Sequence, residues 1–443
     1  MLTRREFTAA GLGLVAAPSV LALLEACGGS GSAPAATQTQ TGPEAAGGKL
    51  EIAWWGGSDR AKRTQQVMDL WTKKYPKYSF DSSFTGFNAY WDKINTQAAG
   101  QALPDIIQMD MRYIGQFTQR NQLLDLTRYA DGDLNMGDFD KGQRDQATVN
   151  GKLYGVSLGG NTQSLLYNAT AISQAGMQPP TGKESWDQFA AYCRQLQAKL
   201  PAGMAALDDS SWDITPFEVF VRQRNKKELY TADGKSVFTR ADTLAWLNMW
   251  SDYRNAGFIV PGPVAAAENQ QDTPDNSTIV LGKAAMRLQW SNFVGQYQIL
   301  MKNATIGLAG HPGGAGTGTY IKVSQLFSLS AKTQFPRAGA AFIGFFITNP
   351  DAVSILGLER GVPPSAKARA TLAPSMSPAD KVQLDFVNAQ VKNNRPKTVL
   401  DPAGAGEVQK AIARNALSIP LSKVTSSAAA DKFMSEANKA LTA

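Results

Sequence analysis

Hydrophobic and polar residues alternate near residue 50 and then change to a helical spacing. In the segment LEIAWWGGSDR, residues 50–60, every second residue from Leu50 to Trp54 is large and apolar, which predicts a short strand. The strand ends at Gly56-Gly57, and residues 61–74 carry apolar side chains at helical spacing. A strand, a glycine turn and a helix make the first half of a βαβ unit, and such units hold ligands at the carboxyl ends of their strands. We therefore expect a ligand beside this loop.

Similar patterns recur along the chain and predict an α/β fold. Residues 78–84 predict a second strand, 92–100 a helix and 103–110 a third strand. Residues 320–330 alternate again, and residues 338–347 follow as a helix. The chain is too long for one hydrophobic core, so two domains are expected.

The first residues have the pattern of an export signal. TRREF, residues 3–7, places two arginines before an apolar run rich in alanine and glycine, as in twin-arginine signals, and we assign residues 1–26 to a signal peptide. LEAC, residues 24–27, resembles a lipobox, so Cys27 is the expected site of lipidation, although Glu25 departs from the usual small residue. If lipidation fails, Ala33-Pro34-Ala35 offers an ordinary cleavage site. Residues 27–48 are small and polar and predict a flexible tether. We expect a bacterial, extracytoplasmic and lipid-anchored protein.

Composition and charge narrow the possible functions. The formal net charge is +7, but there is no arginine-rich run and the protein is expected to leave the cell, so nucleic acid is not an expected partner. Outside the cell a basic protein suits anionic envelope surfaces or mildly favours an anionic ligand. After Cys27 only Cys193 remains, which excludes an intramolecular disulfide, and its helical segment predicts a buried, unreactive thiol.

The residues that most catalytic and metal sites require are scarce. The chain has one histidine, His311, so neither a catalytic triad nor a zinc site rich in histidine can be assembled. We expect no catalytic residue, no metal and no cofactor. A pair of carboxylates could still hydrolyse glycosidic bonds, and candidate carboxylates are present. Their presence does not decide the question, because sugar receptors also use carboxylates to accept hydroxyl protons.

A series of short motifs, in a fixed order, resembles one protein family. The motifs are WWGG (54–57), ALPDIIQMD (102–110), NGKLYGV (150–156), SLLYN (164–168), SWDQF (185–189), GKAAM (282–286) and GVPP (361–364). Together they are similar to extracellular solute-binding protein family 1, the maltose-binding-protein-like lipoproteins of sugar ABC importers. Each motif is weak alone, but their order over nearly the whole mature chain is specific.

The resemblance implies a two-domain periplasmic-binding-protein fold of type II, with a ligand cleft between domains joined by crossover hinge strands. On that plan residues 49–160 and 319–356 form the first α/β domain, and residues 161–318 and 357–443 form the second. It also implies a monomeric, non-enzymatic receptor whose partners are a sugar or short oligosaccharide and the permease subunits of an ABC transporter. Residues 158–162 would make the first crossing. Gly313–Gly318 lacks the ending of a P-loop and is expected to be a hinge loop.

A sugar ring has apolar C–H faces and a rim of hydroxyls, so its site needs aromatic faces and planar polar side chains. The expected aromatic contacts are Trp55, Tyr90, Trp91, Tyr113, Trp212 and Trp290. The expected polar contacts are Asp59, Arg60, Asn88, Asp110, Asn161, Gln163 and Arg360. Trp54 and Trp55 point to opposite faces of their strand, so we expect one in the core and Trp55 toward the ligand.

By motif position, the resemblance carries binding roles to particular residues. They are Trp55, Gly57, Ser58, Asp59 and Arg60 in the first loop, Asp110 and Tyr113 after the third strand, and Trp290 after the GKAAM strand. Trp290 matches the stacking tryptophan of the family's second domain. Residues 398–407, TVLDPAGAGE, lack the family's further stacking aromatic, so a maltodextrin is not the expected ligand.

Two alternatives remain open. Arg60, Arg360 and the basic charge balance would also suit a sugar acid or a glycerol phosphodiester. A secreted glycosidase or a lectin-like surface protein would use the same aromatic and carboxylate residues.

Overall fold

The structure is a computed structural model that describes residues 42–442, apart from 45, 232, 272, 315–317, 392–396 and 398. The described residues belong to one compact unit. The predicted signal peptide, Cys27 and most of the predicted tether lie outside the described residues, as does the middle of the predicted Gly313–Gly318 loop.

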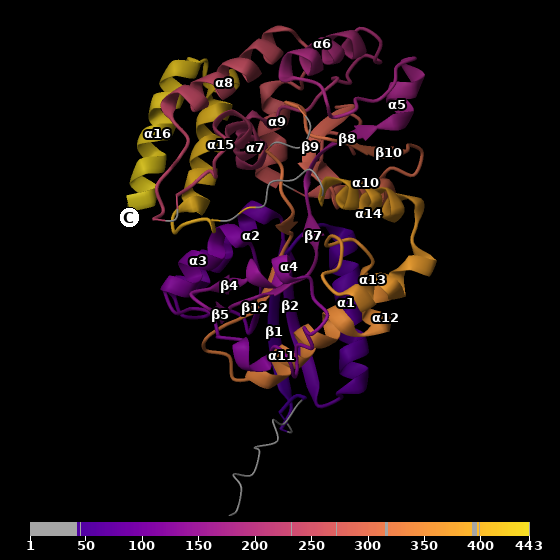
Figure 1. Ribbon diagram of the computed structural model, residues 1–443, viewed down its shortest axis with the longest axis vertical. Helices are drawn as coiled ribbons and strands as arrows, with labels where there is room; N and C mark the ends of the chain where they lie inside the picture. The colour runs from indigo at the N-terminus through magenta and orange to yellow at the C-terminus, as the bar shows by residue number, and fades with distance from the viewer. Residues whose placement is uncertain are drawn as a thin grey trace, which may run out of the picture. The chain divides into compact units, whose positions relative to one another are not determined.

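The first of two main sheets has five strands in the order β2-β1-β3-β12-β6. Figure 1 labels β1, β2 and β12 of this sheet. β1 (Gly48–Trp55) pairs in parallel with β2 (Tyr78–Thr85) and β3 (Ile106–Met109). β12 (Leu326–Leu329) runs antiparallel to β3 and to β6 (Val156–Ser157). Segments more than 200 residues apart therefore share one sheet, so the chain leaves this region and returns to it.

The helices around this sheet form, together with it, what we call the first lobe. These are α1 (Ser58–Lys74), α2 (Phe87–Ala99), α3 (Met111–Gln119), α4 (Lys141–Asp145), α11 (Pro336–Thr348) and α12 (Pro350–Leu356). The lobe also contains the short elements η1 (Thr127–Tyr129), β4 (Thr148–Val149) and β5 (Lys152–Leu153). Its core is one hydrophobic cluster that includes Trp54, Trp71, Trp91 and Phe342. Among the described residues no single helix has the length and apolar composition of a membrane span, and only α11 and α12, bent by 67°, meet that test jointly.

The second main sheet has three antiparallel strands in the order β10-β8-β9 and is the centre of what we call the second lobe. β8 (Gln163–Asn168) lies between β9 (Met286–Trp290) and β10 (Ile306–Ala309). Its helices are α5 (Ala169–Gln174), α6 (Trp186–Gln197), α7 (Ile214–Asn225), α8 (Arg240–Asn255), α9 (Gly262–Gln271), α10 (Phe293–Leu300), α14 (Pro378–Val391), α15 (Ala405–Ser422) and α16 (Ser426–Thr442). The 3₁₀ turns η2 (Ser210–Trp212), η3 (Pro274–Asn276) and η4 (Ala373–Ser375) complete the assignment. Most of this lobe packs around a separate cluster that includes Phe189, Phe217, Trp246 and Phe433.

Three chain segments lie side by side where the lobes meet. β7 (Gly160–Asn161) pairs antiparallel with β11 (Lys322–Val323), and Gly160 exchanges two backbone hydrogen bonds, of 2.8 and 2.9 Å, with Val362. Gly361 has φ +111°, and a Cβ there would lie 2.5 Å from Asn161 Oδ1. The third segment, Gly361-Val362, can approach β7 this closely only because residue 361 has no side chain.

The predicted elements around the first sheet are present, with differences that have local causes. The strands predicted at 50–54, 78–84 and 103–110 correspond to β1, β2 and β3. The stretch at 320–330 divides into β11, which pairs with β7, and β12, which belongs to the five-stranded sheet. The chain passes from one pairing to the other at Ser324, whose N–H donates to Gly159 O.

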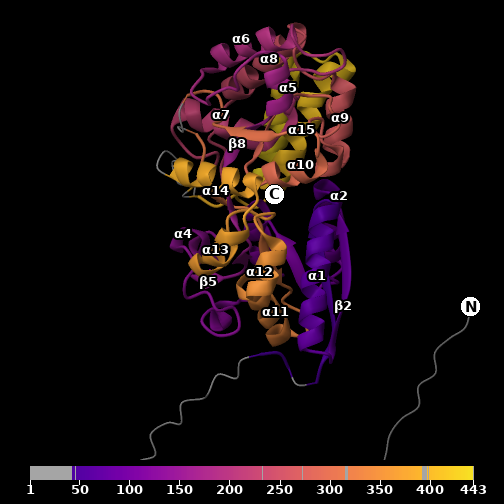
Figure 2. The ribbon, with the colours of Figure 1, turned by 90° about the vertical axis from the view of Figure 1, so that its right-hand side faces the viewer.

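One helix lies in a different lobe from the one that we predicted. The prediction assigned residues 357–443 to the second domain, but α13 (Ala366–Leu372) packs on α12, as Figure 2 shows. Asp138 fixes it there by accepting hydrogen bonds from Ser365 Oγ (2.7 Å) and Lys367 N (2.9 Å). The chain reaches the second lobe only with α14, which packs on α10 and β10. The remaining domain boundaries stay a prediction.

His311 follows β10 and is buried in the second lobe. Its Nδ1 lies 3.0 Å from Pro312 O, its Nε2 has no partner among the described residues, and its ring meets Trp186 edge-on at 5.4 Å. Burial lowers the pKa of His311 from 6.5 to about 4.

Because His311 is buried with a lowered pKa, we predict that the stability of the protein depends on pH through this residue. As the pH falls from 6.5 to 4 the unfolded chain binds a proton at this residue and the folded chain does not, so the free energy of unfolding should fall by about 3 kcal/mol. His311→Gln should remove this part of the pH dependence, measured by denaturant unfolding at pH 7.5 and 4.5. An identical pH dependence in the two proteins would contradict the assignment.

Candidate ligand-binding site

A cavity of about 120 Å³ lies between the two lobes. The first lobe contributes the β1–α1 loop and the β3–α3 junction, and the second contributes the starts of α7 and α10, the end of β9 and part of α15. The segments that cross between the lobes contribute Asn161, Lys322 and Ser324. The cavity is therefore lined by both lobes and by the strands that connect them.

The structure brings together six of the residues predicted from the sequence. Trp55, Arg60, Asp110, Asn161, Trp212 and Trp290 line the cavity. Trp54 belongs to the core and stacks on Phe84 at 5.8 Å, whereas the neighbouring Trp55 reaches the cavity wall. Trp290 is half-buried at the end of β9.

Three aromatic residues that we predicted as contacts lie instead in the core of the first lobe. Tyr90 is 1% exposed and donates from its hydroxyl to Gln108 O at 2.6 Å. Tyr113 stacks on Trp91 with ring centroids 3.6 Å apart. The sequence places these rings beside strand ends, but helices α2 and α3 turn them inward against each other.

Other predicted residues connect the lobes outside the cavity lining. Ser58 Oγ donates to Asp275 Oδ1 at 2.9 Å, and Asn88 Nδ2 donates to Asn269 O at 2.6 Å. Gly57 permits the first contact, because a Cβ there would lie 2.7 Å from Asp275 Oδ2. These residues hold the lobes together.

Asp59 and Gln163 also lie away from the cavity lining. Asp59 pairs with Arg63 at 2.7 Å along α1. Gln163 is buried at the start of β8, and neither polar atom of its side chain has a partner among the described residues.

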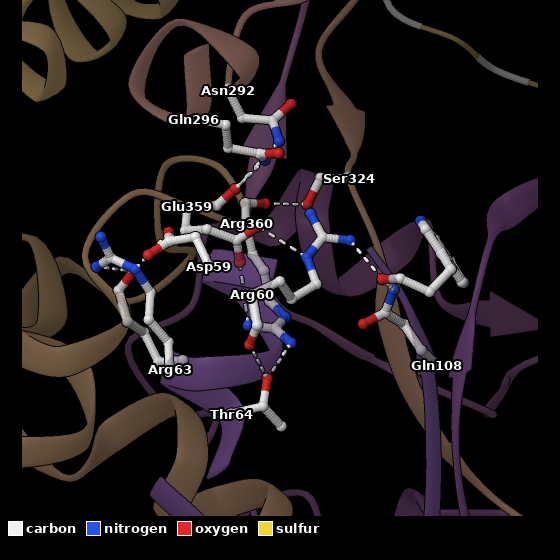
Figure 3. Close-up of polar contacts among 12 residues, drawn as sticks. Asp59, Arg60, Arg63, Thr64, Gln108, Asn292, Gln296, Ser324, Glu359 and Arg360 are labelled. Atoms are coloured by element: carbon white, nitrogen blue, oxygen red, sulfur yellow. Dashed lines mark hydrogen bonds and ion pairs between the residues drawn. The ribbon is translucent and has the colours of Figure 1, made fainter. Parts of the chain in front are cut away.

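Arg60 and Arg360 share one carboxylate, that of Glu359 (Figure 3). Arg60 Nε lies 2.7 Å from Glu359 Oε1, and Arg360 Nη1 lies 3.1 Å from Glu359 Oε2. Arg360 also donates to Thr64 Oγ1 at 2.7 Å. Burial lowers the pKa of Arg360 to about 9, against the opposing effect of Glu359. Of the two predicted arginines, only Arg60 lines the cavity.

The backbone around this cluster also connects the lobes. Glu359 O accepts hydrogen bonds from Asn292 Nδ2 (3.1 Å) and Gln296 Nε2 (3.0 Å), at the start of α10 (Figure 3). In the first lobe, Gly56 has φ +150°, and a Cβ there would lie 2.5 Å from Arg60 Cδ. The glycine turn seen in the sequence therefore lets Arg60 fold back, and its Nη1 donates to Trp55 O at 2.8 Å.

Asp110 and Lys322 form a buried ion pair on the cavity wall. Lys322 Nζ lies 2.6 Å from Asp110 Oδ2 and 5.0 Å from the centre of the Trp290 ring. The other oxygen of Asp110 caps α3 by accepting from Arg112 N at 2.8 Å. Burial lowers the pKa of Lys322, and Asp110 opposes that shift. Lys322 connects the crossing strand β11 to the first lobe and to the aromatic face of the second.

Arg112 connects the first lobe to a buried network in the second. Its Nη1 donates to Gln409 Oε1 at 2.7 Å, and its Nε lies 3.5 Å from Asp401 Oδ2. Asp401 also pairs with Lys397 at 2.6 Å, which in turn pairs with Glu218 at 2.9 Å. Burial disfavours the charged form of Asp401, but Lys397 and Arg112 together hold its pKa below the usual value.

Four buried polar atoms of the cavity residues have no hydrogen-bond partner among the described residues. They are the donors Arg112 Nε and Trp212 Nε1 and the acceptors Asn161 Oδ1 and Gln325 Oε1. A buried polar atom without a partner costs about 1–3 kcal/mol, so a ligand that supplies partners gains this much at each atom. Because a hydroxyl both donates and accepts, one kind of group could satisfy all four.

Within the described part of the chain, no group of three His, Cys, Asp or Glu side chains could hold a metal ion. The two carboxylates of the cavity both cap helices, Asp110 at α3 and Asp213 at α7, where it accepts from Thr215 N at 2.8 Å. Burial raises the pKa of the Cys193 thiol, and Cys193 does not line the cavity. The arrangement suits binding of a polar solute.

Sequence reasoning missed several residues of the cavity. These are Phe87, Arg112, Gln289, Phe293, Lys322 and Gln325. Phe87 and Phe293 each begin a helix that follows a strand, whereas Trp55 is the last residue of its strand. Lys322 had a usable signal, since a lone lysine interrupts the alternating stretch at 320–330.

Comparison with known proteins agrees with this geometry. Residues 56–353 match the family described as bacterial extracellular solute-binding protein, and the chain belongs to this family. It is 30% identical to an extracellular solute-binding protein family 1 structure from Alicyclobacillus acidocaldarius, with 89% of this chain and 98% of that chain covered and a TM-score of 0.62. The predicted family and the two-domain type II α/β fold are thus confirmed.

Two further relatives are named for the carbohydrates that they bind. The arabinooligosaccharide-binding protein of Bacillus subtilis is 24% identical over 226 residues, 49% of this chain and 50% of that protein. The match therefore spans about half the length of that relative. A periplasmic oligogalacturonide-binding protein from Yersinia enterocolitica, solved with saturated digalacturonic acid, is 21% identical, with 89% and 99% of the two chains covered and a TM-score of 0.79. This second likeness shows a shared fold.

The shared carboxylate of Glu359 gives a stability prediction. Glu359→Gln would leave Arg60 and Arg360 buried without their counter-ion, so the free energy of unfolding should fall by about 3–5 kcal/mol. The matched control is Glu407→Gln, which removes an exposed pair with Lys410 and should cost less than about 1 kcal/mol. Denaturant unfolding measures both changes, and equal small losses would show that the buried cluster does not stabilise the fold.

Proposed function

We propose that this protein is the extracytoplasmic receptor of an ABC importer, and that it binds a sugar or short oligosaccharide between its lobes and delivers it to the permease. The observation that carries the proposal is the cavity itself, which combines aromatic rings from both lobes with buried polar atoms that lack partners. It acts by binding and release, without catalysis. The family supports an extracytoplasmic bacterial location.

The chemistry of the cavity favours a sugar over a purely apolar ligand. Trp55 faces it from the first lobe, and Trp212 and Trp290 from the second, and such rings match the C–H faces of a pyranose or furanose. The unpartnered donors and acceptors match its hydroxyls. The names of the arabinooligosaccharide-binding and oligogalacturonide-binding relatives support the same class of ligand.

Trp290 provides the sharpest test of this assignment. A thermal-shift screen over sugars would identify a ligand, since a ligand that binds only the folded protein raises its melting temperature. Trp290→Ala should then weaken binding of that sugar by about 2 kcal/mol or more, roughly 30-fold, because it removes a central aromatic contact. Isothermal titration calorimetry measures the loss.

The control is Trp186→Ala, which removes a half-buried tryptophan of α6 that does not line the cavity. It should leave the affinity unchanged. If Trp290 belonged to the core instead, its loss would lower stability by about 3–5 kcal/mol and leave the affinity of the folded fraction intact. That result would overturn the role proposed for Trp290.

We also propose that the protein is exported by a twin-arginine signal, lipidated at Cys27 and held at the membrane as a monomer by the tether at residues 27–48. Cys27→Ser should release the protein into the soluble fraction, measured by cell fractionation, without changing its affinity for the sugar. One ligand should bind per chain. Protein that stays in the membrane fraction after the substitution would contradict anchoring through this residue.

A further inference from the structure

We propose that the cavity selects uncharged sugars and rejects sugar acids, because each cation among its described lining residues is already paired with a buried carboxylate. This inference rests on the proposed function and narrows its class of ligand. The cations of the cavity are Arg60, Arg112 and Lys322. A site for a uronic acid would instead need at least one cation that is free to meet the ligand's carboxylate.

Lys322 is the cation best placed to meet a ligand, and it is occupied. Its Nζ lies 2.6 Å from Asp110 Oδ2 and also lies over one face of the ring of Trp290, the residue that we assign to the sugar. Both side chains of the ion pair are less than 10% exposed. A ligand carboxylate entering here would meet Asp110 as well as Lys322, so the attraction and the repulsion would largely cancel.

Arg112 and Arg60 are neutralised in the same way from behind the cavity wall. Arg112 faces Asp401, which lies in a balanced network with Lys397 and Glu218. Arg60 faces Glu359. Glu359 is also the partner of Arg360, so the cluster of Arg60, Arg360 and Glu359 has a net charge of +1.

A further carboxylate belongs to the cavity lining. Asp213 lines the cavity and caps α7, and the structure gives it no ion pair among the described residues. Among the described residues, the cavity lining and these ion-pair partners include five cations, Arg60, Arg112, Lys322, Arg360 and Lys397, and five carboxylates, Asp110, Asp213, Glu218, Glu359 and Asp401. The charges of these described residues therefore sum to zero, although the chain carries a net charge of +7.

The unpartnered atoms point to the same class of ligand. A carboxylate only accepts hydrogen bonds, so it could serve Trp212 Nε1 but would leave the acceptors Asn161 Oδ1 and Gln325 Oε1 without donors. Hydroxyl groups serve both kinds. Burying an ionised group without a counter-ion is also strongly unfavourable.

The experiment compares matched neutral and acidic sugars on the whole protein at pH 7. Arabinose, xylose, glucose, galactose and their short oligosaccharides form the neutral set, and glucuronic, galacturonic and digalacturonic acids form the acidic set. Thermal shift identifies binders, and calorimetry gives affinities. We expect binding within the neutral set and affinities about 100-fold weaker for the acidic counterparts, because an acid brings an unpaired charge into the cavity.

Asp110→Asn tests the cause of the selectivity. Asparagine is also a good helix cap, so α3 should keep its start, while Lys322 would lose its counter-ion. The ratio of acidic to neutral affinity should rise by about 10-fold or more, since a ligand carboxylate could now pair with Lys322. The control Asp81→Asn removes the same charge from an exposed pair with Lys49 and should leave the ratio unchanged.

The outcomes separate the two proposals. Tighter binding of an acidic sugar than of its neutral counterpart would overturn this inference and leave the carbohydrate receptor intact. An unchanged ratio in Asp110→Asn would overturn the role given to the Asp110–Lys322 pair. Should that variant fail to fold, the comparison on the unmodified protein still decides the inference. Binding of no carbohydrate from either set would overturn the proposed function and this inference with it.

Discussion

The buried ion pair between Asp110 and Lys322 is the contact on which the arrangement of the site depends. Asp110 follows the third strand and caps α3 in the first lobe, while Lys322 lies on a strand that crosses between lobes and lies over one face of the Trp290 ring of the second. Two buried charges are stable in such a place only when each has a close partner. The pair therefore fixes the position of the crossing strand relative to both walls of the cavity.

The other contacts between the lobes follow the same principle. Arg112 reaches Gln409 from one side, and the backbone oxygen of Glu359 is bound by Asn292 and Gln296 on another. These contacts satisfy charges and polar groups that the lobes could not satisfy separately. What they leave unsatisfied is a small set of buried donors and acceptors on described residues that line the cavity. A hydroxylated solute would complete that set, which is the physical reason for a receptor that binds between its lobes.

The sequence predicted the fold well because strand alternation, helix spacing and the order of motifs are local properties. It also predicted residues such as Trp55, which ends a strand, and Asp110, which directly follows one, and at such positions a side chain can point only toward the cleft or the core. Tyr90 and Tyr113 show the limit of that rule, since only tertiary packing against Trp91 turns them inward. Lys322 and Arg112 were missed because a buried charge is recognisable only when its partner, distant in sequence, is known.

The most direct measurement is a crystal structure of the protein with the tightest-binding neutral sugar. The account predicts the sugar between the lobes, with a ring face against Trp290 and hydroxyls on Arg112 and Asn161. It also predicts that the ion pair of Lys322 with Asp110 remains formed beside the ligand. A sugar bound at any other surface, with the cavity between the lobes left unoccupied, would contradict the account.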